Sequence, residues 1–573
     1  MSFKRSLPDV AWVFVFALVA RLGVLSRFGG SVYFSPSSGD MKFYADWGRR
    51  IAAGHWSDPH AFYGLPGYAF LIGNIFKLAG FSPYTIAFLQ TFSEAAIAAL
   101  IFLLALWAYR GSRARIIGAL AALGWVLFQP AQAFSLIFMP TTWGVLAFWG
   151  AVLWSVRSTS RSLWKPWAAI GVLIGGAATL VATVLLVLPI AIAAAARNLR
   201  KPGAVLAATG FLLGGVAVGT SPCWYHNCFV AREPVFLSAH GGLNFWIGNN
   251  PDANGYPKLT AGLRGTQEGM LNDSIRLAET AAGHPLSRAE VSRYWSDKAH
   301  AFIAGHPVQW LGLMAIKVRN LSNATQYDDL SVINPMWQEG VLTPGLRFGP
   351  VAVLAIAGLA LAWRRDPQAR WIALAVALSL AAVLPVFVTE RYRLAAVPGL
   401  LLLAAGGLTG LGEAVSERNW KRAGIWLGAA CAGTLVAYFP IREPTLLWLD
   451  DYNSGLRHLE SRHIKIARAL FQRALAHSPQ NPDILTALGT SCLKVNDLNG
   501  ARRYYGQALQ IEPKAVEALN NLAIVAAIEG RWAEAIKFLE TALQIEPDDP
   551  KMAELRERCR RKLAQIVPSA CSW

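Results

Sequence analysis

The sequence predicts an all-α protein: a polytopic bundle of about 11–13 transmembrane helices, followed by an α-solenoid. Three observations predict this class. The 573 residues are 54% hydrophobic and only 15% charged, whereas average proteins carry about 25% charged residues. Apolar runs of about 17–25 residues, the length that spans a bilayer, recur over the first 440 residues. After them, small and apolar residues recur every 34 positions, a period typical of stacked helix pairs.

Composition and charge placement also exclude two classes of function, a disulfide scaffold and a nucleic-acid-binding protein. The six cysteines are too few for a disulfide scaffold. A net charge of +18 could indicate nucleic-acid binding, but 36 of the 53 basic residues precede Trp448, and most of the surplus lies in short linkers between apolar runs. Membrane topology accounts for that placement, so we exclude nucleic acid as a partner. Lys4 and Arg5, which precede the first run, predict an uncleaved signal anchor.

The apolar runs give the expected spans in order. They lie near residues 9–27, 62–80, 84–108, 116–136, 139–156, 167–196, 203–221, 346–363, 371–388, 394–412 and 423–440. The run 167–196 is long for one crossing, and Gly175, Gly176 and Pro189 favour two short helices there. This interpretation gives eleven to thirteen crossings.

Basic residues predict the orientation. They cluster in linkers at Arg110/Arg113/Arg115, Arg157/Arg161/Lys165, Arg197/Arg200/Lys201, Arg364/Arg365/Arg370 and Arg418/Lys421/Arg422. The positive-inside rule places these linkers, with the N-terminus, in the cytoplasm. The loops at about 28–61 and 222–345, the turn around Glu390 and everything after Pro440 are then external. In the expected setting, a bacterial inner membrane, that side is the periplasm.

One conflict follows from this assignment. Complete crossings by both 62–80 and 84–108 would put the cluster at Arg110 outside the cell. Either the first of these runs, which Pro66 and Lys77 interrupt, is re-entrant, or the segmentation there is wrong.

The C-terminal part carries an internal repeat. Positions that share the 34-residue period are Pro479, Pro513 and Pro547; Ala467, Ala501 and Ala535; Ala474, Ala508 and Ala542; and Phe471, Tyr505 and Leu539. Small residues at fixed offsets let two helices approach, and each proline ends the second helix before the next unit. The pattern resembles the tetratricopeptide repeat. It predicts a repeat domain at 446–573, with three repeats to about residue 550 and a C-terminal capping helix, after a membrane domain at 1–445.

The first external loop contains the leading catalytic candidate, Asp40. It precedes a segment in which Phe43, Trp47 and Ile51 are spaced for a helix that lies in the membrane interface. The structural alternative is that Asp40 only caps this helix. The functional interpretation is a carboxylate just outside the membrane that takes a proton from an acceptor hydroxyl.

Three segments resemble, in order, those of one enzyme family. They are Gly39-Asp40 with Tyr44, Gly54 and the run Tyr63–Tyr68; the run Gly241–Pro251; and Glu390–Leu394 followed by Pro398. These segments are similar to polyprenyl-phosphate-dependent glycosyltransferases with the GT-C fold. In particular they resemble the glycosyltransferase family 39 enzymes, which include protein O-mannosyltransferases, and the aminoarabinose transferase of lipid A. The resemblance covers roughly residues 9–415.

The resemblance implies an inverting glycosyl transfer on the external membrane face. The donor would be a sugar on an undecaprenyl- or dolichyl-type phosphate, and the acceptor a protein or a glycan. Asp40 matches the family's acidic catalytic residue and would be the base. Arg391 and Arg393 match its basic pair and would hold the donor phosphate, with Lys42 as a weaker candidate. The alternative for the two arginines is snorkelling at a helix end.

The resemblance also bears on a cofactor. Many relatives carry a second acidic residue in the next external turn, but the stretch 134–143 contains none. Asp46 could substitute for it. We therefore assign no metal ligands and leave a divalent cation open as the one candidate cofactor.

Tyr44, Tyr63, Asn244, Asn249 and Asn250 lie in the matching segments and are candidate substrate-binding residues, and His240 next to them is a further candidate. Amide and aromatic groups near Asn244 suit sugar hydroxyls, while the simpler interpretation of that loop is a Gly/Asn turn. His240 could transfer a second proton or could only be solvated.

Cys223 and Cys228 flank His226 on the external side, where a disulfide between the two cysteines is one alternative. Arg21 and Glu94 are charged residues within apolar runs. They could form an ion pair that supports the bundle or could contact the substrate, and the two alternatives are equally supported.

Two other functions remain open. An O-antigen ligase or polymerase would rely on basic residues of a late external loop rather than on Asp40. A non-enzymatic membrane scaffold would act through the repeats, since such solenoids bind peptides in a concave groove. In the leading hypothesis the repeats recruit an acceptor protein or a partner enzyme.

Overall fold

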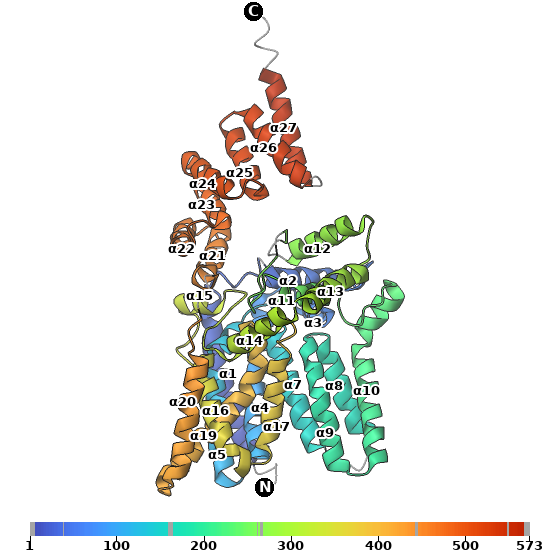
Figure 1. Ribbon diagram of the computed structural model, residues 1–573, viewed down its shortest axis with the longest axis vertical. Coiled ribbons are helices and arrows are strands. Elements are labelled where there is room, and N and C mark those ends of the chain that lie inside the picture. The colour runs from blue at the N-terminus through green and yellow to red at the C-terminus, as the bar shows by residue number, and fades with distance from the viewer. Residues whose placement is uncertain are drawn as a thin grey trace, which may run out of the picture. The chain divides into compact units, whose positions relative to one another are not determined.

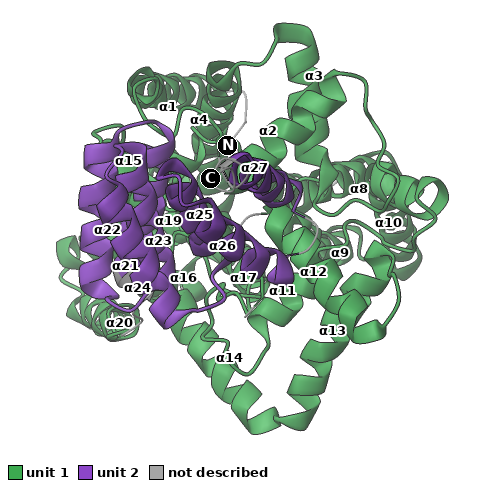
Figure 2. Cartoon of the chain, turned by 90° about the horizontal axis from the view of Figure 1, so that it is seen from above, with its two compact units in different colours: residues 1–441 green, residues 442–573 purple. Residues whose placement is uncertain are grey.

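The computed structural model describes residues 6–37, 39–158, 164–260, 262–263, 267–441, 445–546 and 549–566. In these ranges the chain is built from helices, and one isolated backbone bridge joins Phe128 to Leu346 without forming a strand. The predicted all-α class is confirmed. The chain divides into two compact units, residues 1–441 and 442–573 (Figure 2).

Unit 1 contains a bundle of helices that run side by side (Figure 1). These helices are α1 (Leu7–Phe28), α4 (Pro83–Ala108), α5 (Gly111–Leu127), α7 (Thr141–Arg157), α8 (Trp164–Ala178), α9 (Val187–Leu199), α10 (Pro202–Tyr225), α16 (Phe348–Arg365), α17 (Ala369–Ala381), α19 (Val397–Ser416) and α20 (Trp420–Ala437). Among the described residues, five segments are long and apolar enough to cross a membrane: Leu7–Phe28, Pro83–Ala108, Ala182–Leu199, Pro202–Val230 and Glu390–Ser416. The run 167–196 is divided, as predicted, into α8 and α9.

Helices α8 and α10 approach so closely that only glycine fits between them. A β-carbon at Gly171 would lie 2.1 Å from the carbonyl oxygen of Leu212, and one at Gly175 would lie 2.4 Å from that of Val216. Small residues four positions apart are a common means of packing helices in lipid, where apolar side chains gain little by meeting one another. This contact therefore supports the membrane assignment of the bundle.

A second group of helices is gathered at one end of the bundle. It comprises α2 (Gly39–Ala52), α3 (Pro66–Ala79), α11 (Gly241–Gly248), α12 (Gln267–Ala282), α13 (Arg288–Gly305) and α14 (Pro307–Ser322), with the short helices α6 (Gln129–Phe134), α15 (Ile333–Gln338) and α18 (Glu390–Arg393). Figures 1 and 2 show that α2, α3, α13 and α14 run across the bundle rather than along it. The predicted external loops are found at this end.

The apolar run 62–80 does not cross the bundle. It forms α3, which packs along α2, and a β-carbon at Gly73 would lie 2.8 Å from the side chain of Ile51. The chain therefore reaches Arg110 after the single passage of α4, on the side where the N-terminus lies. This arrangement removes the conflict in the predicted topology.

Helix α2 is the helix expected from its apolar spacing, but its apolar side faces protein. Trp47 and Ile51 are buried in a cluster with Phe62 and Ala69 of the following segment. The predicted contact of this side with the membrane interface is therefore wrong, because α3 covers it.

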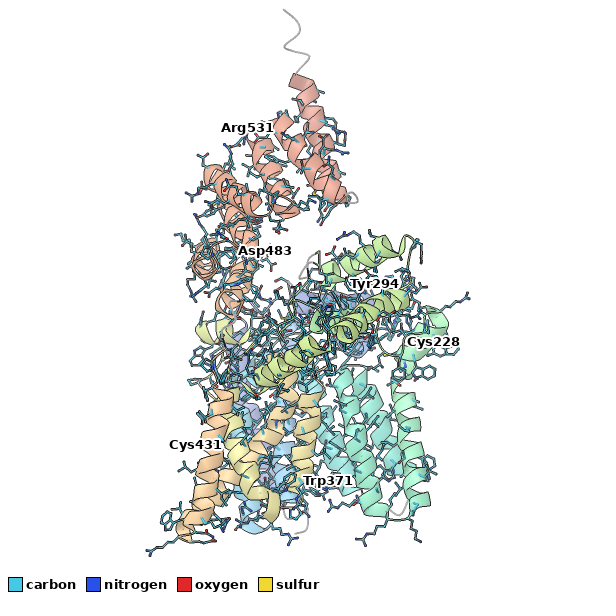
Figure 3. All side chains as sticks on the ribbon, in the orientation of Figure 1. Cys228, Tyr294, Trp371, Cys431, Asp483 and Arg531 are labelled. Carbon is cyan, nitrogen blue, oxygen red and sulfur yellow. The ribbon has the colours of Figure 1, made fainter. Side chains whose placement is uncertain are left out.

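The linkers that carry basic clusters meet at the end of the bundle that holds the N-terminus. Arg115 at the start of α5 pairs with Asp9 at 3.0 Å. Arg197 at the end of α9 lies 5.6 Å from the ring centre of Trp371, which Figure 3 shows at this same end. Such grouping is what the positive-inside rule predicts. Arg161 of the predicted clusters lies outside the described residues.

Arg21 and Glu94 form a buried ion pair inside the bundle. Their side chains are 2% and 0% exposed, with a nitrogen–oxygen distance of 3.2 Å. Arg21 also donates to the carbonyl oxygens of Trp125 and Val126, and Thr142 donates to Glu94. The pair thus joins α1, α4, α5 and α7, which is the supporting role proposed as one alternative.

Unit 2 consists of paired helices. They are α21 (Thr445–Glu460), α22 (Ile464–His477), α23 (Pro482–Lys494), α24 (Leu498–Ile511), α25 (Val516–Ile528), α26 (Trp532–Ile545) and α27 (Pro550–Ile566). The periodic alanines Ala467, Ala501 and Ala535 are fully buried between helices. A β-carbon at Gly489 would lie 2.5 Å from the ring of Tyr505, so the close approach predicted from the repeat is present. Pro547 lies outside the described residues.

Candidate functional site

Asp40 lies in the first turn of α2 and is held by two residues from distant segments. Its Oδ2 accepts a hydrogen bond from Arg391 Nη1 at 2.6 Å, and its Oδ1 accepts one from Gln267 Nε2 at 2.6 Å. Arg391 is 351 positions away in the sequence. Since the carboxylate contacts residues of α12 and α18, its role goes beyond capping α2.

Arg391 binds a second carboxylate that sequence reasoning missed. Its Nη2 lies 2.7 Å from Oδ2 of Asp329, in the segment before α15. Arg391 and Asp40 are each 15% exposed, and Asp329 is 10% exposed. One guanidinium therefore bridges two partly buried carboxylates, and we call Asp40, Arg391 and Asp329 the charged triad.

The environment of Asp329 raises the pKa of its carboxyl. Burial raises the pKa of this carboxyl to about 6, because a charge is poorly solvated there, and the positive charge of Arg391 opposes the shift while the negative charge of Asp40 adds to it. The adjacent Asp328 has a structural task, since its Oδ2 accepts hydrogen bonds from the backbone of Val332 and Ile333.

Tyr44, Tyr63 and His240 surround the charged triad. The backbone N–H of His240 donates to the carbonyl oxygen of Tyr63 at 3.0 Å, and Nδ1 lies 2.9 Å from the same oxygen. Since a carbonyl oxygen only accepts, Nδ1 carries the hydrogen, and Nε2 is the acceptor in the neutral ring. Burial lowers the pKa of His240, so this neutral form is favoured.

The two tyrosines are neutral as well. Burial, with a contribution from the negative charge of Asp40, raises the pKa of both Tyr44 and Tyr63. Within the described part of the chain, neither hydroxyl takes part in a hydrogen bond. Both phenols are therefore available to donate to a bound ligand near Asp40.

Arg393 and Lys42 lie apart from the charged triad. Arg393 is 1% exposed, pairs with the equally buried Glu390 and donates to the carbonyl oxygens of Asn323 and Thr325. It thus holds α18 in place and has no surface for a ligand. Lys42 is 54% exposed and pairs with Asp46 on its own helix.

Asp46 is likewise outside the triad. Besides Lys42 it pairs with Arg49, at 2.6 Å, on the exposed side of α2. These partners lower the pKa of Asp46 although its partial burial acts in the opposite direction. The second carboxylate beside Asp40 is therefore Asp329, not Asp46.

Two of the three candidate asparagines are structural. Asn249 donates to Pro385 O at 2.6 Å and accepts from Trp310 and the buried Lys317. Asn250 folds back on α11, where it donates to the carbonyl oxygen of Trp246. These bonds form the Gly/Asn turn that was the simpler interpretation.

Asn244 differs from both. It lies one turn after His240 and is half-buried. No hydrogen bond of its side chain is found within the described ranges. It stays a candidate for substrate contact.

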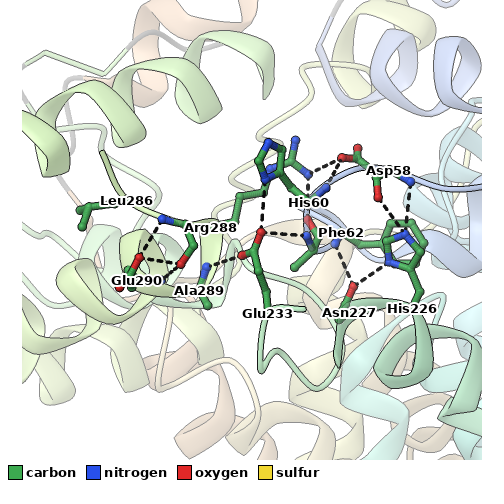
Figure 4. Close-up of polar contacts among 12 residues, drawn as sticks. Asp58, His60, Phe62, His226, Asn227, Glu233, Leu286, Arg288, Ala289 and Glu290 are labelled. Carbon is green, nitrogen blue, oxygen red and sulfur yellow. Dashed lines mark hydrogen bonds and ion pairs between the residues drawn. The ribbon is translucent and has the colours of Figure 1, made fainter. Parts of the chain in front are cut away.

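A polar network fixes the loop that carries Tyr63. Figure 4 shows Glu233 accepting hydrogen bonds from the backbone of Ala61 and Ala289, at 3.3 and 2.9 Å, beside the ring of His60. Arg288 donates to Ala61 O at 2.7 Å. The network ties the first external loop to α13. Cys223 and Cys228, near its edge, are both free thiols.

An apolar groove of about 520 Å³ lies among the bundle helices. Its lining includes Phe14 of α1, Leu100 and Leu103 of α4, and Trp143, Ala147 and Gly150 of α7. A β-carbon at Gly150 would meet no atom within 4 Å, so the groove has open space there.

Aromatic contacts connect the groove with the triad. Trp143, at the start of α7, lies 5.7 Å from Tyr68, and Tyr68 lies 5.0 Å from Tyr44, measured between ring centres. Tyr44 is one helical turn after Asp40. Trp143 of the groove lining is thus linked to Tyr44, beside Asp40, through the ring of Tyr68.

Comparison with known proteins identifies the C-terminal repeats. Residues 493–559 match the tetratricopeptide repeat family. A mouse protein O-mannosyl-transferase, TMTC1, is 24% identical over 142 residues, which are 24% of this chain and 15% of that protein. The matched part is thus a small fraction of the relative's length.

Two solved structures are similar at low level. YrrB, described as a TPR protein with an unusual peptide-binding site, has 16% identity and a TM-score of 0.19, and the match covers 37% of this chain and 91% of YrrB. The Cut9–Hcn1 hetero-tetramer of APC/C has 12% identity and a TM-score of 0.16, with 92% and 99% covered. With scores this low, the helix pairs of unit 2 rest on their own geometry and on the family match. The chain therefore combines an apolar helical bundle, a charged site at its end, and tetratricopeptide repeats.

Proposed function

We propose that this protein is a membrane glycosyltransferase that moves a sugar from a polyprenyl-phosphate donor to an acceptor. The observation that carries the proposal is the direct contact between Asp40 and Arg391. These two residues come from distant segments to the same place, and release of their contact on donor binding would leave a base and a phosphate-binding cation side by side at the reacting carbon. The printed activity of the partial relative, O-mannosyl transfer, supports the same reaction class.

The proposed chemistry is a single displacement. Asp40 takes the proton of an acceptor hydroxyl as its oxygen forms a bond to the anomeric carbon. The bond from that carbon to the phosphate oxygen breaks on the opposite face, and the phosphate leaves with the electron pair. Arg391 compensates the charge that this oxygen gains. Because attack and departure are on opposite faces, the product has inverted configuration.

The apolar groove supports a lipid-linked donor. Trp143 of its lining contacts Tyr68, which contacts Tyr44 beside Asp40, and an isoprenoid chain in the groove is proposed to keep its phosphate at the charged site. We place this site and the repeats in the periplasm of a bacterial inner membrane and the N-terminus in the cytoplasm, in agreement with the basic end of the bundle. The repeats are proposed to hold an acceptor protein or a partner enzyme.

The direct test is donor turnover by the purified full chain in nanodiscs. Dolichyl-phosphate mannose and undecaprenyl-phosphate glucose are the two probes, with water as the acceptor in the absence of a known one. Release of polyprenyl phosphate and a free sugar of inverted anomeric configuration is expected from at least one of them. Release no faster than in empty nanodiscs from both donors, or a product with retained configuration, would contradict the proposal.

Filling the groove is expected to weaken binding of long donors. Gly150→Leu places a side chain in open space, so the fold tolerates it, but it displaces apolar contacts of the lipid. We expect KM to rise about tenfold for an undecaprenyl donor, which corresponds to the loss of roughly 1.5 kcal/mol of apolar burial. The KM of a citronellyl donor is expected to change less.

A matched control is Gly210→Leu. Gly210 lies on α10, and a β-carbon there also meets no atom within 4 Å, but the residue is remote from the groove. Equal KM values for wild type and both variants would show that the donor's lipid does not occupy the groove.

A further inference from the structure

The charged triad does not fit a divalent cation. Mg²⁺ can be held by two carboxylates when waters and phosphate oxygens complete its shell, but such an ion needs the space between Asp40 and Asp329. Among the described residues no group of three His, Cys, Asp or Glu side chains is placed to hold a metal ion. The position between the two carboxylates is taken by Arg391, whose Nη1 and Nη2 lie 2.6 and 2.7 Å from them.

Arg391 already supplies the charge that a metal would bring. A guanidinium stays protonated at all relevant pH values and offers donors in a planar fork that can meet two oxygen groups at once. With about 15% exposure, its field is screened less than that of a surface residue. A single cation between two anions leaves the triad with one net negative charge.

The ion pair with Asp329 holds the guanidinium of Arg391 in place. To meet a donor phosphate, Nη1 must leave Asp40, because Asp40 can act as a base only when that hydrogen bond is released. Nη2 can stay on Asp329 during this change, since it uses the other arm of the fork. Arg391 Nε and Asp329 Oδ1 are buried and have no hydrogen-bond partner within the described residues, so each has capacity for a further contact.

We propose that Asp329 is a positioning residue that anchors Arg391 as a built-in cation, and that the transfer therefore proceeds without a metal ion. This inference rests on the proposed function for its kinetic consequences, but not for its metal-binding ones.

The first test asks whether the wild-type chain needs or binds a metal. Donor turnover is expected to be unchanged after dialysis against EDTA and after addition of Mg²⁺ or Mn²⁺. Titration with Mn²⁺, followed by electron paramagnetic resonance, is expected to show no site that Asp40→Asn removes. Loss of turnover in EDTA with recovery in Mg²⁺ or Mn²⁺, or a stoichiometric Mn²⁺ site that requires Asp40, would overturn the proposal.

The Mn²⁺ measurement needs no turnover, so the two proposals can fail separately. A chain that releases nothing from either donor fails the proposed function, while its Mn²⁺ binding still answers the metal question. The variant Arg391→Ala adds a direct probe of charge. Its turnover is expected to fall at least a hundredfold and to recover in part with added guanidinium or Mn²⁺. No recovery with either ion, at an unchanged melting temperature, would show that Arg391 does not act as a cation.

The second test uses Asp329→Asn, which keeps the shape of the anchor and removes its charge. We expect kcat to fall about tenfold to a hundredfold, because the arginine is less well positioned, and the KM of the donor to fall about threefold. The KM falls because the triad, now neutral rather than negative, repels the donor phosphate less. A variant that is merely less stable would not lower the two constants together.

The pH dependence of KM sharpens this test. Arg391 and Tyr392 of α18 and Asp40 of α2 are the charged and titratable groups that face Asp329. As the pH rises through about 6, Asp329 loses its proton, the triad becomes negative, and KM for the donor is expected to rise. A donor phosphodiester keeps one charge over this range, so the change belongs to the protein. Asp329→Asn is expected to show a flat KM between about pH 5 and 8, and an unchanged rise in this variant would contradict the role of Asp329.

Discussion

Replacement of Asp40 by asparagine is expected to lower the rate of sugar transfer by about 10²–10⁴-fold. The substituted side chain has the same size as the original one, and its amide oxygen can still accept the hydrogen bond from Arg391. What is lost is the ability to take a proton from the acceptor. The loss should therefore appear in kcat, measured as release of polyprenyl phosphate from the donor in nanodiscs, while donor KM should fall about threefold, as in Asp329→Asn, because the triad becomes neutral.

Asp46→Asn is the control for this prediction. It makes the same chemical change on the same helix, at a carboxylate that is 41% exposed and paired only with Lys42 and Arg49 among the described residues. Its transfer rate should equal that of the wild type. If Asp40→Asn retains full transfer, Asp40 is not the base, and loss of function confined to deletion of residues 446–573 would instead favour the scaffold alternative.

The second large effect concerns stability. Glu94→Leu leaves Arg21 buried without its countercharge, and removal of one partner from such a pair costs about 3–5 kcal/mol. The expected result is an unfolding transition at much lower denaturant, measured for the purified protein by titration from mild detergent into SDS. The double variant Arg21→Leu/Glu94→Leu should recover most of the loss, since two apolar groups replace two charges.

A surface pair provides the comparison. Glu417 is 59% exposed and pairs with Arg422, so Glu417→Leu should change stability by about 1 kcal/mol or less. If Glu94→Leu has an equally small effect, the buried pair does not hold the bundle together.

Features that depend on the spacing of residues close together in the chain could be predicted from the sequence. Apolar runs located the bundle helices, and the 34-residue period located the helix pairs, because both reflect how often a buried position recurs along a helix. The motifs around Asp40 and Glu390–Leu394 also pointed to two residues that the structure places in contact.

Other features depend on partners far away in the chain. Nothing near Asp329 distinguishes it from Asp328, and only the fold decides that one meets Arg391 while the other caps backbone groups. Arg391 and Arg393 look equivalent in sequence, yet they face in different directions from a short helix, toward Asp40 and toward Glu390. The run 62–80 is apolar enough for a span, and its position across the bundle follows from its packing on α2.

The contact between Asp40 and Arg391 also constrains when activity can arise during synthesis. Asp40 leaves the ribosome early, with the first external loop, whereas Arg391 emerges 351 residues later. At a typical elongation rate of roughly 5–20 residues per second, the loop would wait in the membrane for tens of seconds without its cation. Under the proposed mechanism, a chain that stops before α18 would hold the base without the cation for the departing phosphate, so incomplete chains would not consume the donor.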